Sequence, residues 1–236
     1  MQYLILPVDN CGVMCGFKNT NYKTYWGFSH WGIDYYDSSL DLKAMGEGKV
    51  LMNGYDNVFG NIIIIQYKDV YNHETKKSSD VICRMYHLAN PSPISVGETV
   101  KQGQSIGVMG STGKYSSGVH VHVEFDSDTQ YYNYGGPLNA DSNLIKKGYD
   151  TSLIDPSYLL YRADYQKIYN KGYTGWTKDY EINLPVLETK TDYEQLYNNL
   201  LNEYNNLVDE NAILNDKYVN YKNALTQINT IVKGVL

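Results

Sequence analysis

The sequence predicts a mainly β domain followed by a C-terminal α-helical coiled coil. Residues 1–160 contain short apolar or alternating runs separated by glycines, as in a sandwich or barrel whose chain turns every few residues. No stretch before residue 150 has the length and periodicity of a long helix. Residues 190–236 change character and carry a seven-residue repeat. Between them, the Tyr-rich residues 161–189 have weak periodicity and are predicted to form a connector.

Several segments of the first domain are predicted to be strands. Residues 48–55 and 60–68 are β-branched or apolar runs bounded by glycine, and residues 80–88 alternate apolar and polar side chains. Glycines between residues 97 and 113 separate very short strands. Residues 116–126, SSGVHVHVEFD, alternate again and are predicted to form a further strand.

The composition excludes several classes of protein. The chain has 236 residues and a formal net charge of −6, and it has no basic run, so it is not expected to bind nucleic acid. Its most apolar stretch, residues 61–67, is strand-sized, and no run reaches the ~18 apolar residues of a membrane span. The N-terminus lacks a charged start followed by a long apolar region, so we expect synthesis in a cytoplasm without a signal peptide.

The chain contains three cysteines, Cys11, Cys15 and Cys83. An odd number of cysteines does not suggest a disulfide framework. Cys11 and Cys15 could pair with each other or bind a metal, but the favoured interpretation is that these are free or buried thiols.

A heptad repeat covers the last predicted element. Two mostly apolar columns recur every seven residues: Tyr197, Tyr204, Asn211, Tyr218, Leu225 and Val232 at position a, and Leu200, Leu207, Leu214, Tyr221, Ile228 and Val235 at position d. A strict 3.5-residue period suits a partner helix, so self-association is favoured over a single helix that lies on the first domain. Asn211 is the lone polar residue at a, a device that fixes register and strand number. Both two and three strands fit the pattern.

The candidates for metal and proton chemistry are His30, Asp34, His87, His120 and His122. His120 and His122 share one face of a strand because side chains alternate with period two. A catalytic zinc site needs three ligands from His, Asp or Glu and keeps a fourth position open, and hydrolysis also needs a general base and an oxyanion-stabilising group. These residues supply that set. Taken singly, a strand histidine is more often a hydrogen-bonded structural residue, and His73, in a polar loop, is expected at the surface.

The order of these motifs resembles the lysostaphin/LytM-type zinc endopeptidases over residues 5–160. The matching segments are HWGIDYY (30–36), GEGKV (46–50), FGNIIII (59–65), YHL (86–88), GETVKQGQSIGVMGSTG (97–113), GVHVHVE (118–124) and IDPSYLL (154–160). The resemblance implies a LytM-like β-sandwich/barrel with a duplicated hybrid motif, and one Zn²⁺ per chain. The glycine-rich part also resembles lipoyl- or biotin-carrier domains, but it lacks a lysine at an exposed hairpin tip with the usual flanking methionines.

The resemblance also implies a role for each candidate. His30, Asp34 and His122 match the three zinc ligands of the family. His120 matches the histidine that acts as general base or orients the attacking water. His87, in the Tyr-His-Leu pattern, matches the other histidine that is not a ligand, which helps to stabilise the transition state.

Further residues have less defined roles. Glu124 shares the face of His122 and could either orient this ligand by a hydrogen bond or serve only as a strand-end residue. By the same resemblance, Tyr22 or Tyr25 could contact the oxyanion. Residues 126–153 are longer than the usual link in the family, and they could form a loop near the cleft or a surface excursion.

The sequence therefore predicts a zinc metalloendopeptidase that cleaves a stem-peptide or cross-bridge bond of bacterial peptidoglycan. The alternative is a catalytically silent module of the same fold, acting in wall binding or at a phage tail tip, which the complete set of candidate residues disfavours. The acidic chain, the missing signal peptide and the coiled coil predict a phage product made in the host cytoplasm. It would act in the virion tail or as a lysin released into the host envelope, with further copies or other virion proteins as partners.

Overall fold

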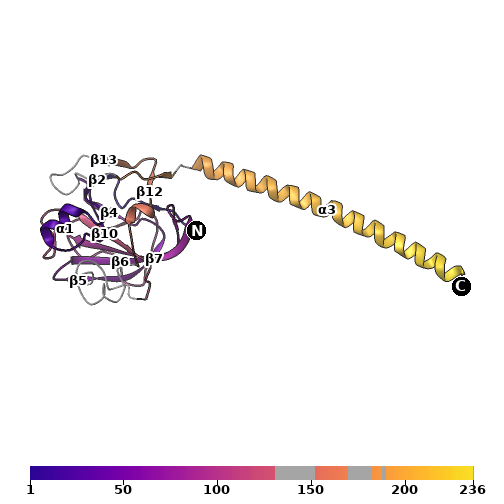
Figure 1. Ribbon diagram of the computed structural model, residues 1–236, viewed down its shortest axis with the longest axis horizontal. Coiled ribbons are helices and arrows are strands. Elements are labelled where there is room, and N and C mark those ends of the chain that lie inside the picture. Colours follow the sequence, from indigo (N-terminus) through magenta and orange to yellow (C-terminus); the bar gives the residue numbers. More distant parts are fainter. Residues whose placement is uncertain (131–151, 170–181, 188–189, 236) are drawn as a thin grey trace. The chain divides into compact units, whose positions relative to one another are not determined.

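The computed structural model describes residues 1–130, 152–169, 182–187 and 190–235, with the side chains of the C-terminal helix described for 200–229. It divides into two units, Met1–Leu187 and Glu188–Leu236. The first unit is mainly β and the second is an α-helix (Figure 1). This confirms the predicted fold class of the first domain and the C-terminal helix. Most of the predicted 126–153 loop lies outside the described residues.

A nine-stranded sheet forms the body of the first unit, in the order β13-β2-β3-β10-β7-β6-β5-β8, with β11 paired to β10. Its strands are β2 (Asn10–Cys15), β3 (Ile33–Tyr36), β5 (Gly48–Asp56), β6 (Gly60–Asn72), β7 (Lys77–Leu88), β8 (Thr99–Val100), β10 (Val121–Asp126), β11 (Leu153–Ile154) and β13 (Lys167–Tyr169). Only β13 runs parallel to its neighbour, β2, among these described pairs. The predicted runs at 48–55, 60–68 and 80–88 are β5, β6 and β7.

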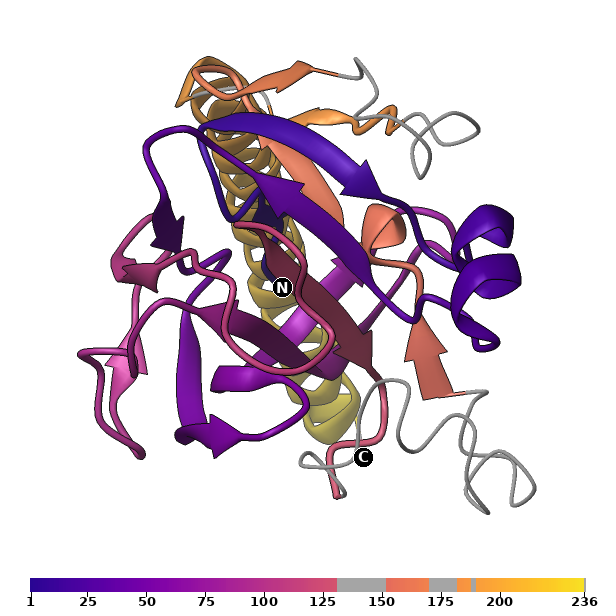
Figure 2. The ribbon, with the colours of Figure 1, turned by 90° about the vertical axis from the view of Figure 1, so that its left-hand side faces the viewer.

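Smaller elements complete the first unit. They are β1 (Leu4–Ile5) with β12 (Leu160–Ala163) and β14 (Val186–Leu187), β4 (Asp41–Lys43) with β9 (Ser105–Val108), the 3₁₀ turn η3 (Pro156–Tyr158) and the helix α1 (Thr20–Trp26). The side chain of Asn19 caps α1 by accepting from the backbone N–H of Tyr22, and the helix ends at Gly27, whose φ of +82° suits glycine. Figure 2 shows this short indigo helix beside the ends of the strands.

The apolar run in β6 is buried on both faces of the sheet. Ile63 and Ile65 pack into the main core, and Ile62 and Ile64 pack with Tyr86 in a second apolar cluster. A strand that is covered on both sides reads as a continuous apolar run instead of an alternating one. This second cluster matters for function because Tyr86 also lines the pocket described below.

The described residues of the predicted connector belong to the first unit. β12 pairs with β1, and β13 pairs with β2, so both extend sheets that begin at the N-terminus. Ile182 is buried in the main core. The buried amide of Gln166 joins this segment to the N-terminal part of the unit. It accepts from Leu6 N–H at 3.3 Å and donates to the carbonyls of Leu6 (2.9 Å) and Val8 (3.1 Å). The compact unit therefore extends to Leu187, beyond the boundary at residue 160 that the motifs suggested.

The second unit contains the helix α3 (Lys190–Val235). Its 46 residues correspond to about 69 Å at the usual rise of an α-helix. Within 200–229, the apolar side chains of both heptad columns are exposed, including Leu200, Leu207, Leu214 and Ile228. Among the described helices, none has the combination of length and apolar character that a bilayer crossing requires.

Replacing Gln166 should show that this C-terminal segment stabilises the first unit. In a Gln166→Ala variant, the buried backbone groups of Leu6 and Val8 lose their partner, so the free energy of unfolding should fall by about 1–3 kcal/mol. Urea unfolding of the two proteins measures the difference. Gln104→Ala, which removes an exposed hydrogen bond to Lys101 N–H, is the control and should change stability by less than about 1 kcal/mol. Equal losses in the two variants would contradict the assignment.

Candidate metal centre

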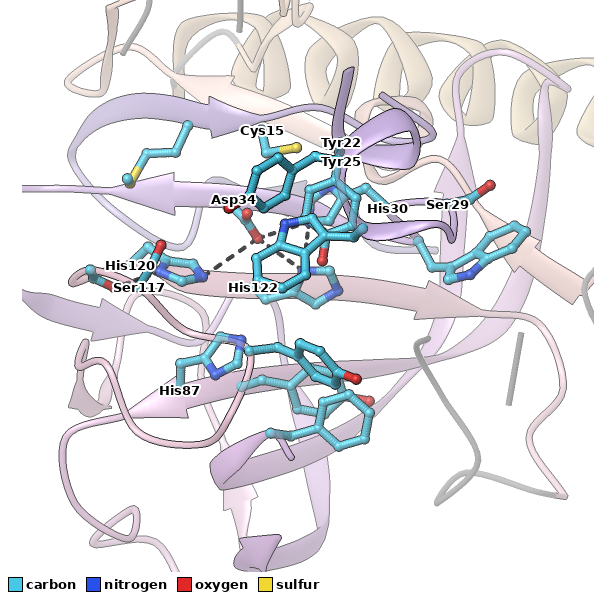
Figure 3. Close-up of a pocket in the computed structure, with 17 residues that line it drawn as sticks. Cys15, Tyr22, Tyr25, Ser29, His30, Asp34, His87, Ser117, His120 and His122 are labelled. Atoms are coloured by element: carbon cyan, nitrogen blue, oxygen red, sulfur yellow. Dashed lines mark hydrogen bonds and ion pairs between the residues drawn. The ribbon is translucent and has the colours of Figure 1, made fainter. Parts of the chain in front are cut away.

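Neighbouring strands bring the predicted site residues together. β3 lies between β2 and β10, and β7 flanks β10 on its other side. In the antiparallel register, His122 on β10 stands opposite Asp34 on β3 and Tyr86 on β7. Cys15 on β2 is the other cross-strand neighbour of Asp34. Together with His30, which precedes β3, these side chains line one pocket (Figure 3).

Three donor atoms converge in this pocket. His30 Nε2 and Asp34 Oδ1 are 3.1 Å apart, and His122 Nδ1 lies 3.0 Å from the first and 2.9 Å from the second. All three residues are buried. Bonds of 2.0–2.1 Å to a tetrahedral zinc would place such ligand atoms roughly 3.3 Å apart. The residues therefore fit a single ion of this kind, and the chemistry of the set, two imidazoles and a carboxylate, is that of a catalytic zinc site.

The glycine between the first two predicted ligands has a steric role. A Cβ atom on Gly32 would lie 2.2 Å from Val123 O and 2.6 Å from His122 Nε2. Both atoms belong to β10, so only glycine lets this strand approach closely enough for His122 to meet His30 and Asp34. The His-x-Gly-x-Asp pattern therefore encodes the packing of a third ligand as well as two ligands.

The groups behind the two imidazoles, a hydrogen-bonded carbonyl for His30 and a nearby carboxylate for His122, favour the nitrogen of each ring that faces the site. His30 Nδ1 donates to Gly16 O at 2.8 Å, so Nε2 presents its lone pair to Asp34 and His122. His122 Nε2 points the other way, 3.7 Å from Glu124 Oε2. A carboxylate behind a ligand histidine orients the ring and raises its basicity. Glu124, predicted either to orient a ligand or to end the strand, lies where it can act on His122.

Glu124 is itself held by a buried arginine. Arg84 on β7 donates to Glu124 Oε1 at 2.9 Å and to Asp126 Oδ2 at 2.8 Å, and the side chains of Arg84 and Glu124 are 0% exposed. Burial alone would lower the pKa of Arg84, but the charges of Glu124 and Asp126 contribute to a net rise, so the guanidinium remains charged. Sequence reasoning missed Arg84, although a charged residue within the otherwise apolar half of a strand pattern is a usable signal.

The charges of the site are strongly coupled. Burial tends to raise the pKa of Asp34, but His30, His120 and His122 outweigh it and hold this pKa well below its usual range. Burial likewise tends to lower the pKa of His122, yet Asp34 and Glu124 raise it to about 9. In the metal-free protein His122 is thus protonated at neutral pH, and metal binding must displace this proton.

The two other candidate histidines face the same pocket. His120 Nδ1 donates to Gly118 O and His87 Nδ1 donates to Thr112 O, both at 2.8 Å. His120 Nε2 lies 3.8 Å from Asp34 Oδ1, and the ring centroids of His87 and His120 are 4.8 Å apart. Because a carbonyl oxygen only accepts, each neutral ring keeps an unprotonated Nε2. Burial, followed by the charges of His120 and His122, lowers the pKa of His87 to about 3.

His87 also has an unusual backbone. Its φ is +69°, in the left-handed region that few residues other than glycine adopt. Asn61 on β6 pairs with Leu88 on β7, but Ile63 pairs with Met85, so the register of the two strands shifts in the stretch that contains His87. Such irregularities change the direction of side chains and are common beside active sites. The Tyr-His-Leu pattern alone does not reveal this conformation.

Cys15 is a neighbour of the site that sequence reasoning did not place there. Its Sγ lies within 4.8 Å of the ligand atoms of His30 and Asp34. The register between β2 and β3 shifts between Val13 and Cys15, and this irregularity puts the cysteine opposite Asp34. Burial and the nearby Asp34 raise the pKa of the thiol, so it stays protonated in the metal-free protein. All three cysteines are free and buried, as the sequence favoured.

Aromatic side chains surround the metal centre. The pocket has a volume of about 480 Å³, and Tyr22, Tyr25, Trp26 and Tyr115 are among its lining residues. The ring of Tyr22 is 4.6 Å from that of His30, and burial followed by the charge of Asp34 raises its pKa. Tyr25 is 71% exposed. The two predicted oxyanion candidates therefore differ, since Tyr22 lies against a proposed ligand and Tyr25 lies at the rim.

A Gly32→Ala variant should bind far less zinc than the wild type, because its new methyl group would push β10 away from β3. Zinc content after gel filtration, measured by mass spectrometry, provides the readout. Gly54→Ala is the matched control, since its Cβ would meet only the flexible Met52 side chain, at 3.4 Å. Retention of one zinc per chain by the Gly32 variant would show that close strand contact is not required.

Comparisons with known proteins place part of the chain among peptidases. Residues 28–134 match Peptidase family M23. The peptidoglycan DD-endopeptidase ShyC of Vibrio cholerae is 34% identical over 98 residues, which cover 41% of this chain and 20% of that protein. The glycyl-glycine endopeptidase ALE-1 of Staphylococcus capitis is 28% identical over 116 residues, 44% of this chain and 29% of ALE-1. The matches thus span between a fifth and three tenths of these curated relatives.

Among solved structures, the catalytic domain of lysostaphin from Staphylococcus simulans is 26% identical, with a TM-score of 0.39, and the match covers 54% of this chain and 76% of that domain. The profile match includes His30, Asp34, His87, His120 and His122. Residues 28–134 are thus a Peptidase family M23 domain, and this region is similar to the lysostaphin/LytM-type endopeptidases.

Proposed function

We propose that this chain is a zinc-dependent endopeptidase that cleaves peptide bonds in bacterial peptidoglycan. The observation that carries the proposal is the convergence of His30 Nε2, Asp34 Oδ1 and His122 Nδ1 within 3.1 Å of one another, beside two further histidines. The substrate class rests on the relatives, which are described as a peptidoglycan DD-endopeptidase and a glycyl-glycine endopeptidase. The bond cleaved would lie in a stem peptide or a cross-bridge.

In this mechanism, His30, Asp34 and His122 hold the zinc. When bound, Zn²⁺ would supply Lewis acidity and lower the pKa of a bound water. His120 is the general base, because its Nδ1 is committed to Gly118 O and its Nε2 is left to accept a proton. Glu124 keeps His122 Nδ1 directed at the ligand set.

The hydrogen bonds refine the role of His87. Its Nδ1 donates to Thr112 O, so the neutral ring accepts at Nε2 and donates there only after it gains a proton. Transition-state stabilisation by His87 therefore requires its protonated form. The proton that His120 takes from the water is the available source, because the rings of His87 and His120 are 4.8 Å apart. A substrate oxyanion would favour this transfer, because it places a negative charge beside an otherwise neutral ring. The same histidine pair can then return a proton to the leaving amine.

A catalytically silent binding module is not favoured. The five polar groups occupy one buried pocket, with Arg84 behind them holding Glu124. Burying charged groups that have no function would be unfavourable for stability, since apolar residues of similar volume are often at least as stabilising. The virion or envelope location stays a prediction from the sequence.

Two histidine variants separate metal binding from proton transfer. His122→Ala should lose zinc and all clearing of a peptidoglycan zymogram. His120→Ala should keep about one zinc per chain and lose activity by roughly 10²–10⁴-fold, the contribution typical of a general base. Zinc content and turnover, measured on the same samples, test this. Clearing that persists in the His120 variant, or in wild type stripped with a chelator, would contradict the mechanism.

We further propose that α3 pairs with α3 of further copies of the chain. The described a and d side chains, such as Tyr204, Leu207, Leu214 and Tyr218, are exposed on this helix. An apolar stripe of this period is stable in water only when another helix covers it. Asn211, at position a, would fix the register of the pair.

The oligomeric state tests this pairing. Leu207→Asp combined with Leu214→Asp places charges in the seam and should convert the protein to a monomer at micromolar concentration. Light scattering coupled to gel filtration gives the mass. Asn206→Asp combined with Val219→Asp, at positions c and b outside the seam, should leave the mass unchanged. A monomeric wild type would rule the pairing out.

A further inference from the structure

A second hollow lies beside β13, the edge strand at the opposite end of the nine-stranded sheet from β8. Its volume is about 880 Å³, and it shares no lining residue with the metal centre. The turn between β6 and β7 contributes His73 and Lys76, β12 contributes Arg162, and the edge strand β13 contributes Lys167 and Tyr169. Nothing in the endopeptidase chemistry uses these residues.

The charge of this hollow is one-sided. Lys76, Arg162 and Lys167 all line it, and none of the described residues that line it is acidic. In the described part of the chain, none of the three forms an ion pair, whereas Lys43 pairs with Asp9 and Arg84 pairs with Glu124 and Asp126. Three basic side chains, none of which has an ion-pair partner among the described residues, therefore line one concavity of a chain whose net charge is −6. Such a site attracts anions from solution.

Hydrogen bonds hold two of the basic side chains, those of Arg162 and Lys76, in position. Arg162 Nη1 donates to Gln166 O at 2.9 Å, and the side chain of Gln166 is anchored in the core. This contact uses only part of the guanidinium, which has five N–H donors. His73 Nε2 bonds with Ser157 O at 2.7 Å, and Lys76 Nζ donates to His73 O. The turn that carries Lys76 is thereby tied to the η3 turn.

We propose that this hollow binds phosphate groups of a phosphodiester polymer. Arginine binds phosphate through two parallel hydrogen bonds and lysine binds it as a point charge, so the combination suits phosphate oxygens. The hollow is much larger than a single phosphate ion. Its other lining residues include Ile182, Leu184 and Pro185, together with the half-exposed ring of Tyr169. These apolar surfaces can contact the carbon segments between successive phosphates.

Such binding would retain the protein on an anionic wall polymer while the metal centre acts on peptide bonds. The phosphate site does not depend on the endopeptidase activity, because the two sites have separate residues. The two proposals can therefore fail independently: a catalytically inactive protein can still bind phosphate, and a protein without phosphate affinity can still cleave.

The experiment uses the full chain, a short synthetic poly(glycerol phosphate) and inorganic phosphate as probes, and calorimetry as the readout. Lys76→Gln combined with Lys167→Gln changes two exposed side chains and should weaken polymer binding about tenfold or more, since two positively charged donors to phosphate oxygens are lost. Lys49→Gln combined with Lys101→Gln removes the same charge from exposed sites elsewhere and should change affinity less than about twofold.

Two arms identify the source of the phosphate. Wild type should bind the polymer more tightly than inorganic phosphate, and it should sediment with cell walls but less with walls whose phosphodiesters have been removed by hydrofluoric acid. Tighter binding of inorganic phosphate would instead assign the hollow to the free ion. Equal weakening in both lysine pairs, no binding of either probe, or equally tight binding of polyglutamate of the same charge would overturn the proposal.

Discussion

The buried contact of Arg84 with Glu124 and Asp126 is the interaction on which the site depends. It joins β7 to β10 and holds the carboxylate that stands behind His122. A buried ion pair contributes little to stability compared with an apolar substitute, but loss of one partner costs about 3–5 kcal/mol because a charge is left uncompensated. The arrangement is therefore better explained by the fixed position it gives to His122 than by stability.

The two hollows of the first unit differ in the side chains that line them. In the metal centre, histidines surround Asp34, and aromatic rings form much of the remaining wall. At the β13 edge, lysine and arginine side chains dominate instead. A pocket lined by aromatic rings suits a peptide segment, whereas the basic hollow suits a charged polymer. A substrate that combines uncharged peptides with anionic chains could occupy both.

Much of the fold could be predicted, because glycine turns and the period-two pattern are local. The motif spacing also pointed to His30, Asp34, His87, His120 and His122, which the structure brings into one pocket. Contacts between distant segments could not be predicted in this way. The places of Cys15 and Arg84 depend on cross-strand register, and the role of Gln166 depends on partners about 160 residues away. The Tyr-rich segment looked like a connector because its strands are very short, with β13 only three residues long.

The hydrogen bonds between Gln166 and residues near the N-terminus have a consequence for the rate of folding. Its side chain bonds to Leu6 and Val8, so the first and last parts of the unit meet across almost its whole length. Contacts of such high sequence separation form slowly, since a long loop must close before they contribute. During synthesis, the edge of β2 stays open until β13 has left the ribosome, and an open strand edge is prone to pair with another chain. Slower translation around residue 169 would prolong this vulnerable interval.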